Sequence, residues 1–183
     1  MEKRIIVVSN SNWLKGKKLG QLIEKYEKIV RFNNYEIEGY EKDVGVSTHI
    51  LYQRCCDDIK IRPNSFEQVY LVQPTCPYLN AMKFVANQYK LVYKDKCSVL
   101  GPQFCDVVAS QIGLNAPQWP SVGAVALYHL ISLYGSLNVI GFDYGASGHY
   151  FKKQPVDAKN HDFAKEAHFF KNLVDSGKIT EIW

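Results

Sequence analysis

The sequence lacks a cysteine pattern that would suggest disulfide bonds or a metal site. It has five cysteines, an odd number, and two of them, Cys55 and Cys56, are adjacent. Cys97 and Cys105 have no histidine or cysteine partners at the intervals that zinc sites use. Reduced thiols are the simplest interpretation, and they favour a reducing compartment such as the cytosol.

Long apolar runs are also missing. No stretch approaches the roughly twenty consecutive apolar residues that a membrane-spanning helix needs. The apolar run after Lys3 and Arg4 is short and passes directly into polar residues, which argues against a signal peptide. We therefore expect no membrane span and a cytoplasmic protein. A catalytic core cut from an anchored protein is the less simple alternative.

Neither of the common glycine-rich phosphate loops occurs: the chain contains no G-x-x-x-x-G-K-[ST] and no G-x-G-x-x-G. Side chains would therefore have to bind any nucleotide. The net charge of +4 is spread along the chain, apart from a short basic run at residues 15–18. Without a basic stripe or an aromatic stacking motif we expect no nucleic-acid binding, and only mild help for anionic ligands.

What the chain does contain is the composition of an ordinary globular protein. Its 183 residues, 46% hydrophobic and 22% charged, predict one domain over residues 1–183 that needs no disulfide or metal. Apolar runs of strand length occur at residues 4–9, 28–32, 46–52, 68–72, 98–101, 138–142 and 178–183. Helical patterns occur at residues 19–26, 80–89, 105–112, 122–134 and 162–174. The alternation predicts a Rossmann-like α/β sandwich with a mostly parallel central sheet flanked by helices.

Asn10 and Ser11 follow the first apolar run directly. Polar residues at the carboxyl end of a strand are typical of ligand sites in open α/β sheets. Asn10 could instead be a simple turn residue. Residues 145–159 form the longest irregular segment, and loops of that length are often functional.

Four groups of residues carry a more specific signal. The first comprises VVSNS at 7–11, LG at 19–20, IVRFN at 29–33 and GYEKDVGVST at 39–48. The others are PSVG at 120–123 with NVIGF at 138–142, HYF at 149–151, and the H-x-x-x-x-E spacing of His161 and Glu166. In this order they resemble the large, small, third and very small sialyl motifs of the eukaryotic-type sialyltransferases, glycosyltransferase family 29. Residues 50–119 have no counterpart.

The resemblance implies an inverting transferase with a GT-A-like variant of the fold. Such an enzyme moves sialic acid from CMP-sialic acid to a glycan hydroxyl without an obligatory metal or other cofactor. The sequence agrees in having no Asp-x-Asp motif, since Asp57 and Asp58 are adjacent and read as a solvated turn.

The departures from the family pattern are specific. The two family cysteines that form a disulfide correspond here to Ile5 and Tyr134. Ser9 and Asn12 replace glycines, and Lys152 replaces an acidic residue, which puts the role of that carboxylate in doubt. The chain is also much shorter than animal members.

Two histidines carry the implied chemistry. His161 would be the general base, since an acceptor hydroxyl needs a base with a pKa near neutrality. Its predicted place at a helix N-terminus disfavours the imidazolium form. The alternative is that His161 only caps the helix. His149 would bind the departing phosphate, helped by Lys152 and Lys153.

The remaining predicted site residues would bind the CMP-sugar. Asn10 and Asn33 would hold the phosphate and ribose, and Ser121 and Gly123, at a helix start, suit a phosphate or carboxylate. The full donor-binding set is Asn10, Ser11, Asn33, Ser121, Gly123, Gly141, Phe142 and Tyr150. We expect Glu166 to be structural, bonding a loop backbone, His129 to be a core residue and His168 to lie on a helix surface.

Two other functions fit the same residues. Another CMP-activated acidic sugar, such as CMP-Kdo, could be the donor, because the motifs chiefly describe the CMP half. The chain could also be a CMP-binding protein without transfer activity. The sequence does not specify the acceptor sugar, the linkage or the oligomeric state.

Overall fold

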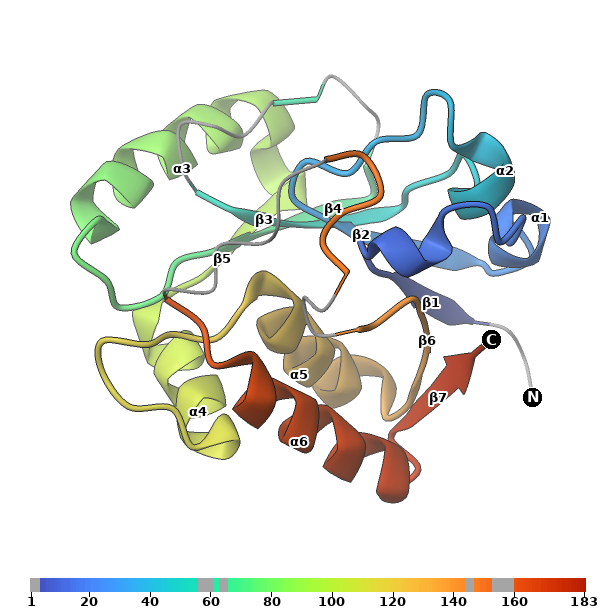
Figure 1. Cartoon of the computed structure of the whole chain (residues 1–183). Coiled ribbons are helices and arrows are strands. Elements are labelled where there is room, and N and C mark those ends of the chain that lie inside the picture. The colour runs from blue at the N-terminus through green and yellow to red at the C-terminus, as the bar shows by residue number, and fades with distance from the viewer. Residues whose placement is uncertain (1–3, 56–60, 63–65, 144–146, 153–159) are drawn as a thin grey trace.

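The protein folds around one twisted sheet, seen edge-on in Figure 1. The computed structural model describes residues 4–55, 61–62, 66–143, 147–152 and 160–183. Its seven strands are β1 (Ile5–Val8), β2 (Lys28–Phe32), β3 (Ile50–Arg54), β4 (Gln68–Val72), β5 (Cys97–Leu100), β6 (Leu137–Ile140) and β7 (Ile179–Ile182). They lie in the order β5-β4-β3-β2-β1-β6-β7, and every neighbouring pair is parallel.

Helices cover both faces of the sheet. One face carries α1 (Gly20–Ile23), α2 (Glu41–Val44) and α3 (Leu79–Tyr93), and the other carries α4 (Pro102–Ile112), α5 (Val122–Tyr134) and α6 (Phe163–Asp175) (Figure 1). Two 3-10 turns, η1 (Asn12–Leu14) and η2 (Lys94–Lys96), complete the described elements. The predicted α/β class and parallel sheet are confirmed.

The central strands are buried on both sides because successive side chains point to opposite faces. In β1, Ile5 and Val7 pack under α4–α6, whereas Ile6 and Val8 pack with η1 and α1. β2 to β5 lie on one side of β1, and β6 and β7 lie on the other, so the direction of the strand order reverses at β1. A crevice at such a point is where open α/β sheets bind ligands.

Most predicted elements are present, with shifted ends. The predicted helix 122–134 matches α5, and Ser121 caps it by accepting a hydrogen bond from the Ala124 amide at 3.1 Å. The strand expected from residue 46 starts only at Ile50, because the amides of Val46 and Ser47 bind the Glu24 carboxylate. The short helix α2 was not predicted. Of the expected loop 145–159, only residues 147–152 lie in the described part.

The most specific motif run, residues 39–48, turns out to be a scaffold. Asp43 accepts hydrogen bonds from the amides of Gly16 and Lys18 at 2.8 and 2.9 Å. Glu24 accepts from the amides of Val46 and Ser47 at 2.8 and 3.0 Å. These bonds fix α2 and its loop behind β2, so the motif supports the site without forming its wall.

Gly20 of the Leu19-Gly20 pair shows why the family pattern needs a glycine. A Cβ at Gly20 would lie 2.2 Å from the Glu41 carbonyl oxygen and 2.9 Å from the Gly45 nitrogen. We expect Gly20→Ala to lower the free energy of unfolding by about 1–3 kcal/mol, because α1 and α2 must separate. Gly101→Ala is the control, since a Cβ there meets no atom within 4 Å. Urea unfolding of both variants checks this, and equal midpoints would contradict it.

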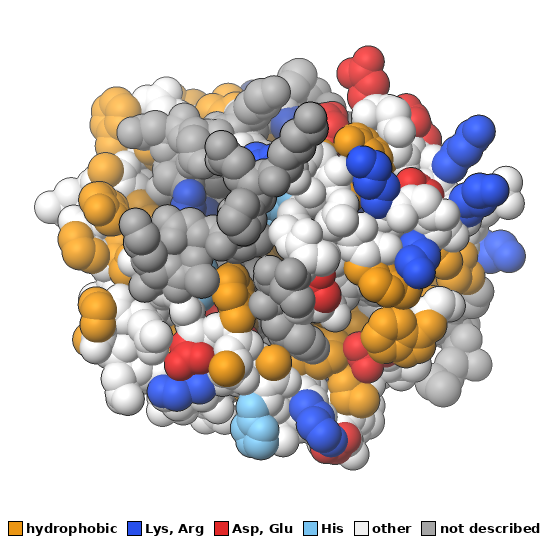
Figure 2. Space-filling model, in the orientation of Figure 1, with side chains coloured by type: hydrophobic (Ala, Val, Ile, Leu, Met, Phe, Trp, Pro, Cys, Tyr) orange, Lys and Arg blue, Asp and Glu red, His pale blue; other side chains and the backbone are white. Residues whose placement is uncertain are grey.

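Basic side chains in Figure 2 gather over α1 and α2, near the basic run 15–18, and acidic side chains lie among them.

Of the cysteines, Cys55, Cys76, Cys97 and Cys105 are described, and all four are free thiols. Burial raises the pKa of Cys55 and of Cys105 to about 12, so both stay protonated at neutral pH. Within the described ranges no helix is both long and apolar enough to cross a bilayer.

Candidate active site

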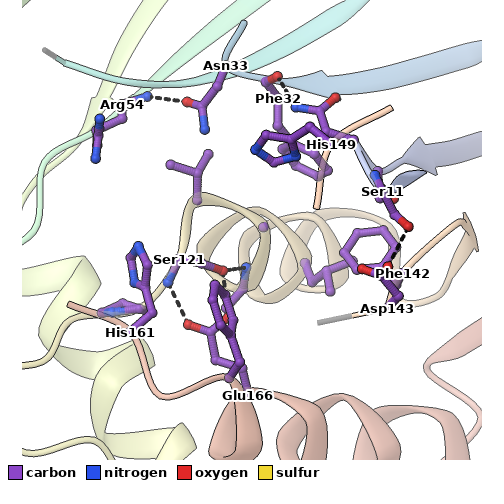
Figure 3. A pocket seen from close by; sticks show the side chains of 18 of the residues that line it. Ser11, Phe32, Asn33, Arg54, Ser121, Phe142, Asp143, His149, His161 and Glu166 are labelled. Carbon is purple, nitrogen blue, oxygen red and sulfur yellow. Dashed lines mark hydrogen bonds between the residues drawn. The ribbon is translucent and has the colours of Figure 1, made fainter. Parts of the chain in front are cut away.

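A cavity of about 430 Å³ opens at the carboxyl ends of β1, β2 and β3, against the first turns of α5 and α6 (Figure 3). This volume is in the range of small-molecule sites. The lining includes eight of the ten predicted site residues: Asn10, Ser11, Asn33, Ser121, Gly123, Phe142, His149 and His161. The structure therefore brings together residues from all four motif groups.

The turn after β1 is held by its own polar side chains. Asn10 donates from Nδ2 to the Phe32 carbonyl oxygen at 3.0 Å, which ties the ends of β1 and β2 together. Ser11 donates its hydroxyl proton to Asp143 Oδ2 at 2.7 Å and accepts from the Trp13 amide at 3.0 Å. Because a hydroxyl has one proton to give, Ser11 positions the turn through these bonds. Its part in donor binding stays a prediction.

Gly141 and Tyr150 are corrected, since neither lines the cavity. Gly141 has φ of 74°, and a Cβ there would lie 2.7 Å from Leu14 Cγ. The Tyr150 side chain is buried, and its hydroxyl donates to the Glu36 carbonyl oxygen at 2.5 Å. Both residues support the wall from behind.

Asn33 follows β2 directly in a left-handed conformation, with φ of 48°, which asparagine tolerates better than most residues. Its Oδ1 accepts from the Arg54 amide at 2.9 Å, which joins the ends of β2 and β3. The amide nitrogen of Asn33 consequently points into the cavity in Figure 3, where it can donate to a ligand oxygen.

His149 is carried to the cavity by the segment that follows β6. This segment pairs with the β1 turn through an isolated bridge between Ser11 and His149 and a 2.8 Å bond from the Asn12 amide to the Gly148 carbonyl. The His149 ring stacks on Phe151 with centroids 5.3 Å apart. Burial, followed by the charge of Lys152, lowers the pKa of His149. The uncharged ring is therefore favoured at neutral pH.

His161 lies just before α6, with Nδ1 2.9 Å from the Trp119 carbonyl oxygen. A carbonyl oxygen can only accept, so Nδ1 carries the proton and Nε2 of the neutral ring has a free lone pair. The helix cap is Asp162, which accepts from the Lys165 amide at 3.1 Å. The alternative that His161 only caps the helix is therefore wrong.

Glu166, one turn into α6, is 6% exposed. Its carboxylate accepts the Ser121 amide at 2.7 Å and the Ser121 hydroxyl at 2.6 Å. The expectation that Glu166 bonds a loop backbone is confirmed. Both donors of Ser121 are used in these bonds, and its contact with a phosphate or carboxylate of the ligand stays a prediction.

Aromatic rings form the floor of the cavity. Phe142 stacks on Phe170 with centroids 5.5 Å apart and meets Phe32 edge-on at 6.1 Å. The cavity is thus apolar at its centre, with polar groups at the strand ends and at the starts of α5 and α6. Such a site suits a ligand with a flat or apolar part and anionic or hydroxyl groups at its edges.

Comparison with known proteins agrees with these motifs and this geometry. A family model described as "Glycosyltransferase family 29 (sialyltransferase)" matches residues 2–57 and 64–178. The chain belongs to glycosyltransferase family 29. The recognition made from the motifs is confirmed.

Relatives in family 29 are distant in sequence and longer than this chain. The rat CMP-N-acetylneuraminate-beta-galactosamide-alpha-2,3-sialyltransferase 4 is 26% identical over 98% of this chain and 64% of its own length. The mouse CMP-N-acetylneuraminate-beta-galactosamide-alpha-2,3-sialyltransferase 2 is 26% identical over 97% of this chain and 56% of its own. The chain therefore spans less than two thirds of the length of either relative.

A crystal structure of a mammalian sialyltransferase superimposes with a TM-score of 0.77 over 99% of this chain and 69% of that one, at 21% identity. The same fold is present in a mammalian sialyltransferase in complex with Gal-beta-1-3GalNAc-ortho-nitrophenol, with a TM-score of 0.76 and 22% identity. The predicted family 29 fold is thereby confirmed.

The family 29 motifs did not reveal several residues of the cavity wall. Trp119 and Arg54 lie in the part of the chain without a motif, and Asp143 follows the small motif directly. Trp119 lies immediately before Pro120 and the helix cap Ser121, so its place beside the cap could have identified it as a residue of the cavity wall. Arg54 ends β3 but lies two residues beyond the third predicted strand, 46–52, so the strand prediction stopped short of it.

The last features of the site are the charge of Lys152 and the side chains that could bind a metal ion. Lys152 lines the cavity, so a cation stands where family 29 has an acidic residue. Lys153, Asp57 and Asp58 lie outside the described residues. Where the chain is described, no group of three His, Cys, Asp or Glu side chains could hold a metal ion.

Proposed function

We propose that this chain transfers sialic acid from CMP-sialic acid to a glycan hydroxyl, with His161 as the general base and His149 at the leaving phosphate. The observation that carries the proposal is the Nδ1 contact of His161 with Trp119, which leaves Nε2 as a proton acceptor in the same cavity as an uncharged His149. Membership in family 29 supports the donor, and the named activities of the relatives support a β-galactoside acceptor and an α-2,3 linkage.

The reaction would be a single displacement. The acceptor oxygen attacks the anomeric carbon of the sialyl group while its proton passes to His161 Nε2. The bond from the anomeric carbon to the phosphate oxygen breaks, and its electron pair stays on CMP. A hydrogen bond from His149 and the charge of Lys152 stabilise the phosphate as that bond breaks. We propose that no metal takes part.

Donor competition tests the proposal against its alternatives. Wild-type protein is incubated in EDTA with a β-galactoside acceptor and either CMP-sialic acid or CMP-Kdo, and the released CMP and the glycoside are quantified. A sialylated product supports the proposal. A product from CMP-Kdo alone supports the rival donor, and CMP binding without a product supports a binding protein that has no transfer activity.

The role of His149 gives a separate prediction. We expect His149→Ala to lower kcat/KM for the donor by about 100-fold, as for the loss of one donor at a developing negative charge. Because the lowered pKa leaves His149 neutral, a neutral donor should replace it, and His149→Gln should restore most of the rate. Initial rates at pH 7.5 measure this. Equal losses in both variants would show that a charged imidazole is required.

A further inference from the structure

Asp143 lies where three parts of the cavity wall meet. It comes three residues after the end of β6, it lines the cavity, and Figure 3 shows its side chain bonded to Ser11 of the β1 turn. Its Oδ2 atom accepts from the Ser11 hydroxyl at 2.7 Å and from the Ser147 amide at 3.0 Å, and it also accepts from the Ser147 hydroxyl. One carboxylate oxygen thus joins the end of β6, the β1 turn and the segment that carries His149.

Two backbone hydrogen bonds pair this segment with the β1 turn. The Asn12 amide donates to the Gly148 carbonyl oxygen at 2.8 Å, and the Tyr150 amide donates to the Asn10 carbonyl oxygen at 3.1 Å. His149 lies between these two bonds. The turn and the segment must therefore keep one register for the His149 ring to stay at the cavity.

Side chains anchor the segment on both sides of His149. On the far side, the Tyr150 hydroxyl donates to the Glu36 carbonyl oxygen at 2.5 Å. On the near side, the Ser147 amide and hydroxyl donate to Asp143. Loss of the Asp143 carboxylate would release the Ser147 end, and the imidazole could then leave the place where it meets the phosphate.

The bonding pattern at Asp143 suits a carboxylate better than any other side chain. Three donors converge on one oxygen, and an ionised carboxylate offers only acceptors. Hydrogen bonds to a charged acceptor are about twice as strong as neutral ones. A carboxylate would repel the phosphate of a bound nucleotide, so this acid serves the structure of the wall and not a direct contact with that phosphate.

The charge of Asp143 is also close to the ring of His149. Burial and the charge of Lys152 lower the pKa of His149, and the Asp143 carboxylate opposes both effects. The acid that fixes the segment therefore lies near the histidine that the segment carries.

We propose that Asp143 is a positioning residue for His149: its carboxylate joins the β1 turn to the segment before His149 and so holds the imidazole where the leaving phosphate binds. The inference rests on the proposed function and deepens it, because it concerns the same phosphate site. Asp143 itself would not touch the phosphate. Its effect on a ligand would pass through His149.

A double-mutant cycle on ligand affinity tests the proposal without relying on catalysis. Dissociation constants for CMP and for cytidine, which lacks the phosphate, are measured by NMR titration of wild type, Asp143→Ala, His149→Ala and the double variant. We expect Asp143→Ala to weaken CMP by about 10-fold, as for the loss of one hydrogen bond to a charged group, and to change cytidine by less than about twofold. In the His149→Ala background the same substitution should change CMP affinity by less than about twofold, because the ring that Asp143 positions is gone.

Two further variants separate positioning from general support. Asp143→Asn keeps an oxygen acceptor of the same shape, so it should restore part of the CMP affinity, and it replaces Asp143→Ala in the cycle if that variant does not fold. Asp106→Ala is the matched control, because Asp106 also accepts from a hydroxyl, that of Thr75 at 3.2 Å, but does not line the cavity. Both ligands should bind Asp106→Ala as they bind wild type.

Three results would overturn the assignment. The first is an equal loss of CMP and cytidine affinity in the Asp143 variants, which would make Asp143 a general support of the cavity. The second is a loss of CMP affinity that is as large in the His149→Ala background as in wild type. The third is no loss of CMP affinity in either Asp143 variant. Failure of the wild-type protein to bind CMP would instead contradict the proposed function, before any variant is compared.

Discussion

Replacing His161 with alanine is expected to reduce transfer by about 100- to 10,000-fold, the usual contribution of a positioned general base. The acceptor hydroxyl would then have no group to take its proton during attack. CMP affinity should change by less than about twofold, because His161 acts on the acceptor side. Single-turnover rates and a CMP titration of the same preparation measure both quantities.

His168 offers a matched control on the same helix, since its side chain is exposed and does not line the cavity. His168→Ala should retain wild-type rates. If His161→Ala instead loses CMP binding in proportion to activity, the base assignment fails, and the residue belongs to the donor site.

Loss of the Glu166 carboxylate is the second large effect that we expect. Glu166→Ala removes the carboxylate that accepts from Ser121, and the amide and hydroxyl of this half-buried residue would lose their partner. The free energy of unfolding should fall by about 2–4 kcal/mol at pH 7, and transfer should fall with it, because Ser121 begins α5 at the cavity. Chemical denaturation and initial rates measure the two losses. An unchanged denaturation midpoint would contradict this role.

Glu166→Gln separates the shape of this side chain from its charge. Burial raises the pKa of Glu166, so the folded state favours the protonated acid more than the unfolded chain does. The associated stabilisation is complete below the ordinary value of 4.5 and is lost as the pH rises through the folded-state pKa. Wild type should therefore lose more stability than Glu166→Gln between pH 4 and pH 7. Parallel stability curves for the two proteins would contradict the raised pKa.

The parts of the fold that the sequence predicted well are those with local signals. The ends of α5 were correct because Ser121 supplies a cap and Gly135 a positive φ of 79°. The start of β3 was misplaced because Val46 and Thr48 are β-branched, yet Glu24 binds the backbone of Val46 and Ser47 from 22 and 23 residues away. No local pattern carries that information.

The same division holds for the site. Strand ends and motifs identified eight residues of the cavity wall. This was possible because the carboxyl ends of parallel strands lie at one edge of the sheet, where such folds bind ligands. The contact of Glu166 with Ser121 joins residues 45 positions apart, so no local pattern could predict it. Arg54 and Trp119 lie in the segment without a motif, and only the folded sheet brings them to the cavity.

The stereochemistry of the product tests the central claim most directly. CMP-sialic acid is a β-glycoside, and a single displacement assisted by His161 must invert the anomeric carbon. We predict that the wild-type protein, in EDTA and with a β-galactoside acceptor, forms an α-linked sialoside, identified by NMR on the first product formed. A β-linked product, or release of CMP with no glycoside, would contradict the account.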